Sequence, residues 1–373
     1  MALPEPASLF IGLMSGTSTD GVDTVLAEFP PAKTPRLIAQ ASLPMPQALR
    51  AEFLALNTPG HDELARGARA GNELALLYAQ ACRQLLEMSG VAASHIRAIG
   101  AHGQTVRHDP QSGFSIQINA PALLAELTNI DVVADFRSRD IAAGGQGAPL
   151  VPAFHQAIFN ADTARAILNL GGIANVTILE PGREPRGFDT GPANVLLDLW
   201  CHEKTGALYD AGGRWAASGQ THAVLLEAML NDEPWFALPP PKSTGRDLFN
   251  RSWLMDKLAG FDEAGLADED IQATLQSLTA ASIQQALAAH APEIREVLVC
   301  GGGALNSSLM SELEYRLGLP VYPTSVLNVP VQSVEALAFA WLAWAHVKRI
   351  PAGLPSVTGA HAPTVLGACY PAG

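Results

Sequence analysis

The chain has 373 residues, a hydrophobic content of 48%, a charged content of 16% and a formal net charge of −13. One hydrophobic core rarely fills such a length, so we expect two domains, and the apolar content excludes a disordered chain. The acidic charge argues against a nucleic-acid partner, because surfaces that bind nucleic acids are basic.

Targeting and cysteine patterns are those of an ordinary intracellular protein. Residues 1–9 lack the basic and apolar regions of a signal peptide, and the longest apolar stretch, residues 336–347, is too short to cross a bilayer. The four cysteines are far apart and form no Cys-x-x-Cys pair, which excludes a zinc site or a disulfide framework of the usual kinds. We therefore expect a cytoplasmic protein with no membrane partner.

The first part of the chain alternates strand-like and helix-like segments, which predicts an α/β fold with mixed sheets. Three strands joined by tight turns are expected at residues 8–14, 23–29 and 36–43, followed by a helix over 61–90 that ends at Gly90. Residues 96–105 are expected to form a buried strand that runs into a polar loop. The next elements are expected to be a strand at 114–119, a helix at 120–128 and a strand at 131–136.

The glycine-rich segment 142–152 interrupts this pattern, so we place the domain boundary there, between a domain over 1–141 and one over 142–333. Residues 165–180 repeat the opening order of apolar run, small turn and apolar run, as two related domains would. The remaining elements are expected to be a strand and helix over 186–198, a helical region over 246–291, a strand, triple glycine and helix over 296–317, and an apolar helix over 333–348.

Residues 15–21 read SGTSTDG, with more hydroxyl groups than a tight hairpin turn requires. The glycines would let backbone N–H groups approach a ligand. The pattern leaves two interpretations open, a polar surface turn and a ligand loop.

Three further positions also have two interpretations each. Gly301–Gly303 fit either a turn against a phosphate or flat ligand, or a tight packing turn, and Asn306 in place of the third glycine excludes the Rossmann pattern. Asp189, at the end of a short strand, is either a general base or a helix cap. Glu335 opens an apolar helix, where the helix dipole alone favours an acidic residue.

Two motifs remain ambiguous by themselves. His102 in GAHGQT is either a strand-end residue at a ligand cleft or a buried core histidine. The PPKSTG segment lacks the first glycine of a P-loop, so it is either an anion contact around Lys242 or a surface loop.

Phosphoryl transfer needs backbone donors around the phosphates, a carboxylate near the metal and a base that orients the acceptor. The SGTSTDG segment with Asp20, the Gly171–Gly172 turn, the triple-glycine turn and Asp189 supply these in order. This order resembles the sugar kinase, actin and heat-shock-chaperone superfamily, in which two related domains close over ATP.

The resemblance extends to one family, anhydro-N-acetylmuramic acid kinase, from about residue 10 to residue 368. The segments that carry it are IGLMSGTSTDGVD, GAHGQT, DVVADFRSRDIAAGGQGAPLVPAFH, LNLGGIANV, GFDTGPAN, PKSTGRD and VCGGGALN. It implies an actin-like fold with an ATP cleft between the domains, and a C-terminal helix within 334–373 that completes the first one. It also implies a homodimer that uses ATP and water to open 1,6-anhydro-N-acetylmuramic acid, giving N-acetylmuramic acid 6-phosphate and ADP in cytoplasmic peptidoglycan recycling.

The resemblance also implies roles for individual residues. Asp189 would be the catalytic base that activates water, and Glu335 a second acidic residue near the sugar. The implied nucleotide-binding residues are Gly16, Thr17, Ser18, Thr19, Asp20, Gly21, Val22, Asp23, Gly171, Gly172, Gly301, Gly302 and Gly303, with Asp20 near Mg²⁺. The implied substrate-binding residues are His102, Gln104, Thr105, Arg137 and Asn175, with Arg137 preferred to Arg139 for the lactyl carboxylate. The chain departs from the family pattern at Thr19 and at Asn119–Ala120.

Two other functions compete with the kinase. A glycoside hydrolase would use Asp189 and Glu335 as paired carboxylates, although it leaves the three glycine-rich turns unexplained. A non-enzymatic scaffold of the actin or chaperone type would bind ATP without a sugar substrate.

Overall fold

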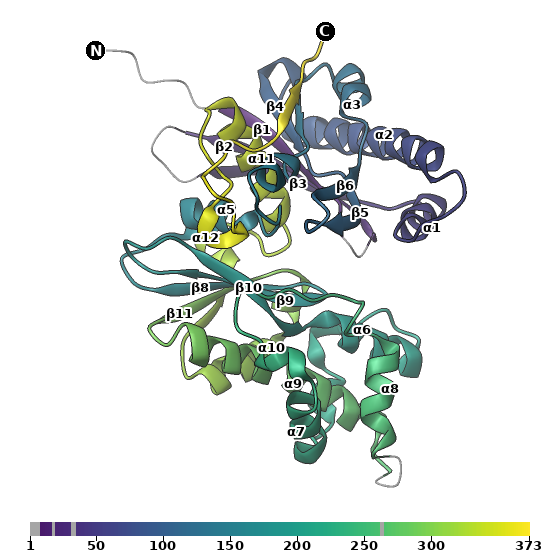
Figure 1. Cartoon of the computed structure of the whole chain (residues 1–373), viewed down its shortest axis with the longest axis vertical. Helices are drawn as coiled ribbons and strands as arrows, with labels where there is room; N and C mark the ends of the chain where they lie inside the picture. Colours follow the sequence, from purple (N-terminus) through teal and green to yellow (C-terminus); the bar gives the residue numbers. More distant parts are fainter. Residues whose placement is uncertain (1–7, 17–18, 31–34, 262–264) are drawn as a thin grey trace. The chain divides into compact units, whose positions relative to one another are not determined.

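The computed structural model describes residues 8–16, 19–30, 35–261 and 265–373. The chain divides into two compact units, unit 1 from Met1–Ile158 and Ser333–Gly373 and unit 2 from Phe159–Gln332. Each unit is a mixed sheet flanked by helices (Figure 1). The predicted α/β class is therefore confirmed.

Unit 1 contains the strands β1 (Ser8–Met14), β2 (Gly21–Phe29), β3 (Arg36–Pro44), β4 (Ile96–Ala101), β7 (Val132–Ala134) and β13 (Ala368–Tyr370). Among the described residues they form a six-stranded sheet in the order β13-β7-β4-β1-β2-β3. Strands β1, β2 and β3 are an antiparallel meander, whereas β4 runs parallel to β1 and β7 parallel to β4. A separate hairpin is formed by β5 (Gln104–Asp109) and β6 (Phe114–Ile118).

The helices of unit 1 are α1 (Gln47–Leu56), α2 (Glu63–Ser89), α3 (Pro121–Thr128), α4 (Ser138–Ala142), α5 (Val151–Phe159, whose last residue begins unit 2), α11 (Val334–Val347) and α12 (Pro355–Thr358). Helix α2 ends, as predicted, at Gly90, which has φ +68°. Helix α11 coincides with the predicted apolar helix over 333–348.

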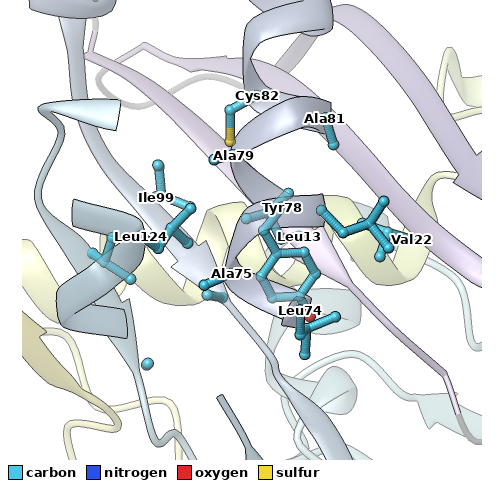
Figure 2. Packing of buried hydrophobic residues seen from close by; sticks show 14 of the residues in the cluster. Leu13, Val22, Leu74, Ala75, Tyr78, Ala79, Ala81, Cys82, Ile99 and Leu124 are labelled. Carbon is cyan, nitrogen blue, oxygen red and sulfur yellow. The ribbon is translucent and has the colours of Figure 1, made fainter. Parts of the chain in front are cut away.

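Alternation along β1 assigns its two faces to different helices, because successive strand side chains point to opposite sides. Ile11 and Leu13 join the apolar cluster that contains Leu74 and Tyr78 of α2, part of which is drawn in Figure 2. Gly12, between them, meets α11. A Cβ atom on Gly12 would lie only 1.9 Å from the carbonyl oxygen of Ala336.

Gly100 of β4 makes the same kind of approach, since its Cβ would lie 2.0 Å from the carbonyl oxygen of Phe339. Two neighbouring parallel strands thus present glycines where α11 crosses them. This close backbone packing fixes the position of α11 and of Glu335 in its first turn.

Unit 2 contains the strands β8 (Arg165–Leu170), β9 (Ile173–Leu179), β10 (Arg186–Pro192), β11 (Glu296–Cys300) and β12 (Val321–Pro323). Their order is β10-β9-β8-β11-β12 in the described part of the chain. Its longer helices are α6 (Asn194–Thr205), α7 (Ala223–Asn231), α8 (Arg251–Ala259), α9 (Asp268–His290) and α10 (Ser307–Leu317).

The two sheets share one topology. In each, three antiparallel strands form a meander, the fourth strand pairs in parallel with the first, and a fifth pairs in parallel with the fourth. The order of apolar run, small turn and apolar run that residues 165–180 share with residues 8–29 therefore reflects the same sheet topology in both units, as expected of related domains.

The unit boundary lies at Ile158/Phe159 instead of 141/142. The glycine-rich segment stays with unit 1 because the C-terminal segment hydrogen-bonds to it: the Gln146 N–H donates to the Thr358 carbonyl at 2.9 Å, and the His361 N–H to the Ala143 carbonyl at 2.9 Å.

Three expectations about local structure need correction. Gln104 and Thr105 begin strand β5 and are not part of a loop. The helical region 246–291 consists of two helices, α8 and α9. Helices α1 and α7 and strands β12 and β13 were not predicted. The two strands are only three residues long, whereas α1 does carry a helical spacing that was missed, with Leu49, Phe53 and Leu56 buried. No helix among the described residues is long and apolar enough to cross a membrane.

Candidate functional site

The segment after β1 is a turn held under strain. The Thr19 N–H donates to the Gly16 carbonyl at 3.1 Å, and Thr19 has φ +52°, a left-handed conformation that a β-branched residue rarely adopts. Thr19 is buried and Asp20 is exposed. Thr17 and Ser18, two of the predicted nucleotide-binding residues, lie outside the described residues.

The predicted loop is shorter than 16–23. Gly21, Val22 and Asp23 begin strand β2, and the side chain of Val22 is fully buried in the apolar cluster of unit 1. Only the backbone of Val22 remains to meet a ligand.

His102 and Gln104 hold the start of this turn. Because β1 and β4 are parallel neighbours, the segments that follow them meet at one edge of the sheet. The Gln104 side chain accepts a hydrogen bond from the Ser15 hydroxyl and donates to the Gly16 carbonyl at 3.1 Å. His102 Nδ1 lies 3.2 Å from the Ser15 carbonyl oxygen.

His102 is thereby a buried, satisfied histidine, only 5% exposed. Burial, reinforced by the nearby Arg137 charge, lowers the pKa of His102 to about 3, so the ring is neutral. Its Nδ1–H therefore donates to Ser15, and Nε2 accepts from Arg137 Nη2 at 2.9 Å. Thr105 accepts from Gln117 Nε2 at 3.2 Å in the β5–β6 hairpin.

Arg137 is half-buried next to α4 and donates through Nη1 to the Gly147 carbonyl at 2.7 Å. Burial lowers the pKa of Arg137 to about 10, opposed by the negative charges of Glu335 and Asp140, so it remains a cation at neutral pH. Arg139, the other candidate, is exposed.

Glu335 lies in the first turn of α11, near Arg137 and the acidic residues of the β1–β2 turn. Burial raises its pKa, the Asp23 and Asp20 carboxylates raise it further, and Arg137 opposes them. The pKa of Asp23 is itself raised by loss of hydration and by Asp20, against a hydrogen bond with Ser42. Unit 1 therefore gathers three carboxylates and one guanidinium at one end of its sheet.

In the described part of the chain, no group of three or more His, Cys, Asp or Glu residues is arranged to hold a metal ion. A kinase Mg²⁺ ion is typically held by one or two carboxylates together with waters and substrate phosphates. The exposed Asp20, beside Asp23, fits such a partial site.

Asp189 lies within β10, not at its end, beside a β-bulge between Asp189 and Gly191. The helix-cap interpretation is wrong, because α6 begins at Asn194 and its N-cap position is Ala193. Asn175, on β9, is the cross-strand partner of Asp189. The two predicted polar residues therefore lie next to each other.

The PKSTG segment, residues 241–245, hydrogen-bonds to Asp189 of β10. The Thr244 N–H donates to Asp189 Oδ2 at 2.9 Å, and the Asp189 N–H donates to the Lys242 carbonyl at 3.1 Å. Burial raises the pKa of Asp189 to about 6, while the Thr244 hydrogen bond and the Lys242 charge oppose the shift. A carboxylate with a pKa close to neutral is well suited to accept a proton.

The side chain of Lys242 is held by neighbouring residues of unit 2. Its Nζ donates to the Phe236 carbonyl at 2.9 Å and lies 4.3 Å from the centre of the Trp235 ring. The segment is thus neither a P-loop nor a plain surface loop. It surrounds Asp189 with a backbone donor and a cation.

The two glycine turns of unit 2 also meet, because β8 and β11 are parallel neighbours. Gly301, with φ +82°, would place a Cβ 2.5 Å from Asn169 Oδ1, and Gly303 would place one 2.6 Å from Leu170 Cβ. Gly171, Gly172 and Gly302 have nothing closer than 3.7 Å to an added Cβ. Tight packing therefore explains Gly301 and Gly303, whereas a side chain at the other three positions would make only ordinary van der Waals contacts.

Asn194 was missed from the sequence. Its N–H donates to the Gly171 carbonyl and its Nδ2 to the Leu170 carbonyl, each at 3.0 Å, and Gly303 lies beside its side chain. It joins the two glycine turns. An asparagine at a helix start reads as an ordinary cap, so its spacing gave no signal of this role.

The pKa of Asp189 predicts an acidic limb in the pH profile. A general base at Asp189 would be active when ionised, so kcat/KM should then rise with pH through about 6 and level off. Lys242→Met removes a charge that favours the ionised carboxylate, so the limb should move to higher pH. The measurement is kcat/KM against pH.

Lys257→Met is the matched control, because Lys257 also lies over a tryptophan ring, that of Trp253, but is not among the charges that act on Asp189. An unshifted limb in Lys242→Met, or an equal shift in Lys257→Met, would contradict the assignment.

The lowered pKa of His102 predicts that the free energy of unfolding decreases in acid. Its pKa is lowered on folding, so between about 3 and about 6.5 the unfolded chain binds the proton and stability falls as pH falls. At pH 5 one such histidine costs about 2 kcal/mol. Urea unfolding at pH 7 and pH 5 should show a smaller loss for His102→Gln than for the wild type. The exposed His61→Gln should lose as much as the wild type, and an equal loss in all three would refute the prediction.

Comparisons with known proteins agree with the resemblance. A family model described as anhydro-N-acetylmuramic acid kinase matches residues 8–372. A protein of that name from Bordetella parapertussis is 64% identical over 367 residues, which cover 98% of this chain and 97% of that protein. One from Burkholderia lata is 54% identical, over 97% of this chain and 96% of that protein.

Among solved structures, the activator of the 2-hydroxyisocaproyl-CoA dehydratase from Clostridium difficile aligns with a TM-score of 0.48 and 13% identity, over 92% of this chain and 96% of that chain. That likeness is too distant to say anything about the site. The family model and the relatives cover nearly the whole chain, so the chain belongs to the anhydro-N-acetylmuramic acid kinase family.

Proposed function

We propose that this protein is an ATP-dependent kinase that opens 1,6-anhydro-N-acetylmuramic acid with water and phosphorylates O6, giving N-acetylmuramic acid 6-phosphate and ADP. Family membership supports the substrate and the transferred group. The observation that carries the chemistry is Asp189, a carboxylate held by the Thr244 N–H with a pKa of about 6.

In the proposed reaction, Asp189 takes a proton from water, whose oxygen forms a bond to the anomeric carbon. The bond from that carbon to O6 breaks, and O6 takes the γ-phosphoryl group while ADP leaves. Among the residues that the structure describes, the carboxylate of Asp189 accepts a hydrogen bond at Oδ2, from the Thr244 N–H, which leaves Oδ1 for this role. Asn175, the cross-strand neighbour of Asp189, is our candidate for a contact with the sugar.

Unit 1 supplies the remaining proposed contacts. Arg137 is the cation for the lactyl carboxylate, since it keeps its charge despite burial. Glu335 lies close enough to Arg137 for their charges to interact, and it is the second acidic residue near the sugar. His102 and Gln104 act first on the Ser15–Gly16 turn, because their polar atoms are engaged there.

The nucleotide contacts are assigned to backbone groups of Gly16–Asp23 in unit 1 and of the Gly171–Gly172 and Gly301–Gly303 turns in unit 2. The exposure of Gly172 and Gly302 supports this assignment. Asp20 would hold Mg²⁺, which neutralises phosphate charge when bound. The wider setting, a homodimer in bacterial cytoplasm that recycles peptidoglycan fragments, rests on the family alone.

A coupled ADP assay with the anhydro sugar tests this proposal. We expect ADP release that requires the sugar, and a product heavier than the substrate by one water and one phosphoryl group. Ring opening at full rate without ATP would favour the glycoside hydrolase, and tight ATP binding without sugar-dependent ADP release would favour the scaffold. Family membership favours neither alternative.

A further inference from the structure

Asp140 is a fully buried carboxylate, 0% exposed, that the proposed reaction does not use. Its Oδ1 accepts a hydrogen bond from the Thr358 hydroxyl at 2.8 Å, and its Oδ2 accepts one from the Gly147 N–H at 2.8 Å. A buried charge is costly unless it is hydrogen-bonded or paired. The Asp140 carboxylate therefore needs both the segment that carries Gly147 and the segment that carries Thr358 to be in place.

Two glycines let the backbone close around this carboxylate. A Cβ on Gly145 would lie 2.3 Å from Asp140 Oδ2, and one on Gly353 would lie 3.0 Å from Oδ1. The glycine-rich segment and the C-terminal segment therefore approach Asp140 more closely than residues with side chains could.

The contacts of Asp140 continue toward the substrate residues through one residue, Gly147. Gly147 donates its N–H to Asp140 and accepts from Arg137 Nη1 at 2.7 Å. Arg137 in turn donates to His102 Nε2 at 2.9 Å, and His102 holds the Ser15 carbonyl. An unbroken path of hydrogen bonds thus leads from Thr358 to the turn after β1.

We propose that Asp140 is a positioning residue that, through the backbone of Gly147, orients the Arg137 guanidinium toward the substrate carboxylate, and that the Thr358 hydroxyl holds Asp140 in place for this. This rests on the proposed role of Arg137. Asp140 acts in two ways, by fixing the carbonyl that orients Arg137 and by supplying a negative charge nearby. A path through Thr358 makes this residue part of substrate recognition although it does not touch the substrate.

Thr358→Val removes the hydroxyl at nearly constant volume, and Thr358→Ser keeps it. We expect Thr358→Val to raise KM for the anhydro sugar about tenfold, as loss of a hydrogen bond to a charged group implies, with little change in kcat or in KM for ATP. Thr358→Ser should restore the wild-type KM. Thr128→Val is the control, because the Thr128 hydroxyl bonds only the Leu124 carbonyl in α3.

A second measurement does not depend on activity. In ¹⁵N-histidine-labelled protein, the Nε2 signal of neutral His102, identified by its loss in His102→Gln, reports on the Arg137 contact. We expect it to shift in Thr358→Val and, more strongly, in a folded Asp140→Asn, but not in Thr128→Val. A sugar KM in Thr358→Val equal to that of Thr128→Val, or an unmoved His102 signal, would overturn the proposal.

Failure of the proposed function is distinguishable from failure of this inference. If the wild-type protein shows no sugar-dependent ADP release, the proposed reaction is wrong. The His102 signal would still decide whether Asp140 and Thr358 orient Arg137.

Discussion

Asp189→Asn is expected to keep nucleotide binding and to lower kcat by about 10²–10⁴-fold, the usual contribution of a general base. The amide has nearly the shape of the carboxylate and can still accept from the Thr244 N–H through its oxygen. It cannot take a proton from water at neutral pH. Turnover by the coupled ADP assay and ATP affinity by calorimetry measure the two effects separately.

Asp256→Asn makes the same chemical change on an exposed position of α8 and should leave kcat unchanged. Near-normal turnover in Asp189→Asn would remove Asp189 as the base. Loss of ATP binding together with turnover would instead indicate a folding defect, which a thermal melt would reveal.

Gly12→Ala is expected to have the largest effect on stability. The new methyl group would lie 1.9 Å from the Ala336 carbonyl oxygen and 2.6 Å from the Ala340 nitrogen, so α11 would have to move off β1. Both obstacles are backbone atoms, which no rotamer change can displace. We expect the free energy of unfolding to fall by about 3 kcal/mol, at the upper end of measured overpacking effects, with loss of activity as Glu335 shifts.

Urea unfolding of unit 1 measures this change. The control is Gly60→Ala, whose new methyl group would meet only the end of the Arg66 side chain, at 3.3 Å. Because that side chain can move, stability should stay close to that of the wild type. Equal midpoints for the two variants would show that α11 does not need Gly12.

Local pattern predicted the elements best where burial alternates or repeats regularly. Strand β1, helix α2 and helix α11 appear within two residues of their expected bounds, because each carries a continuous apolar period and α2 also has a terminating glycine. The break between α8 and α9 was missed, although Gly260 at the C-cap of α8 is a helix-end signal of the same kind as Gly90.

The sequence by itself determined the fold class, the topological repeat and the identity of the family, because these depend on periodicity and on motifs contiguous along the chain. Only the tertiary structure decided what the motif residues contact. His102 and Gln104 hold the Ser15–Gly16 turn because β1 and β4 are parallel neighbours, although the two segments are 87 or more positions apart.

Within SGTSTDG, Ser15 and Gly16 are therefore held by residues that follow β4, and Thr19 has a left-handed conformation. Likewise, burial raises the pKa of Asp189 while the Lys242–Thr244 segment opposes the shift, and Asp140 accepts a hydrogen bond from Thr358. Hydrogen bonds and burial between distant segments produce no periodic pattern in the sequence, so these roles could be recognised only in the folded chain.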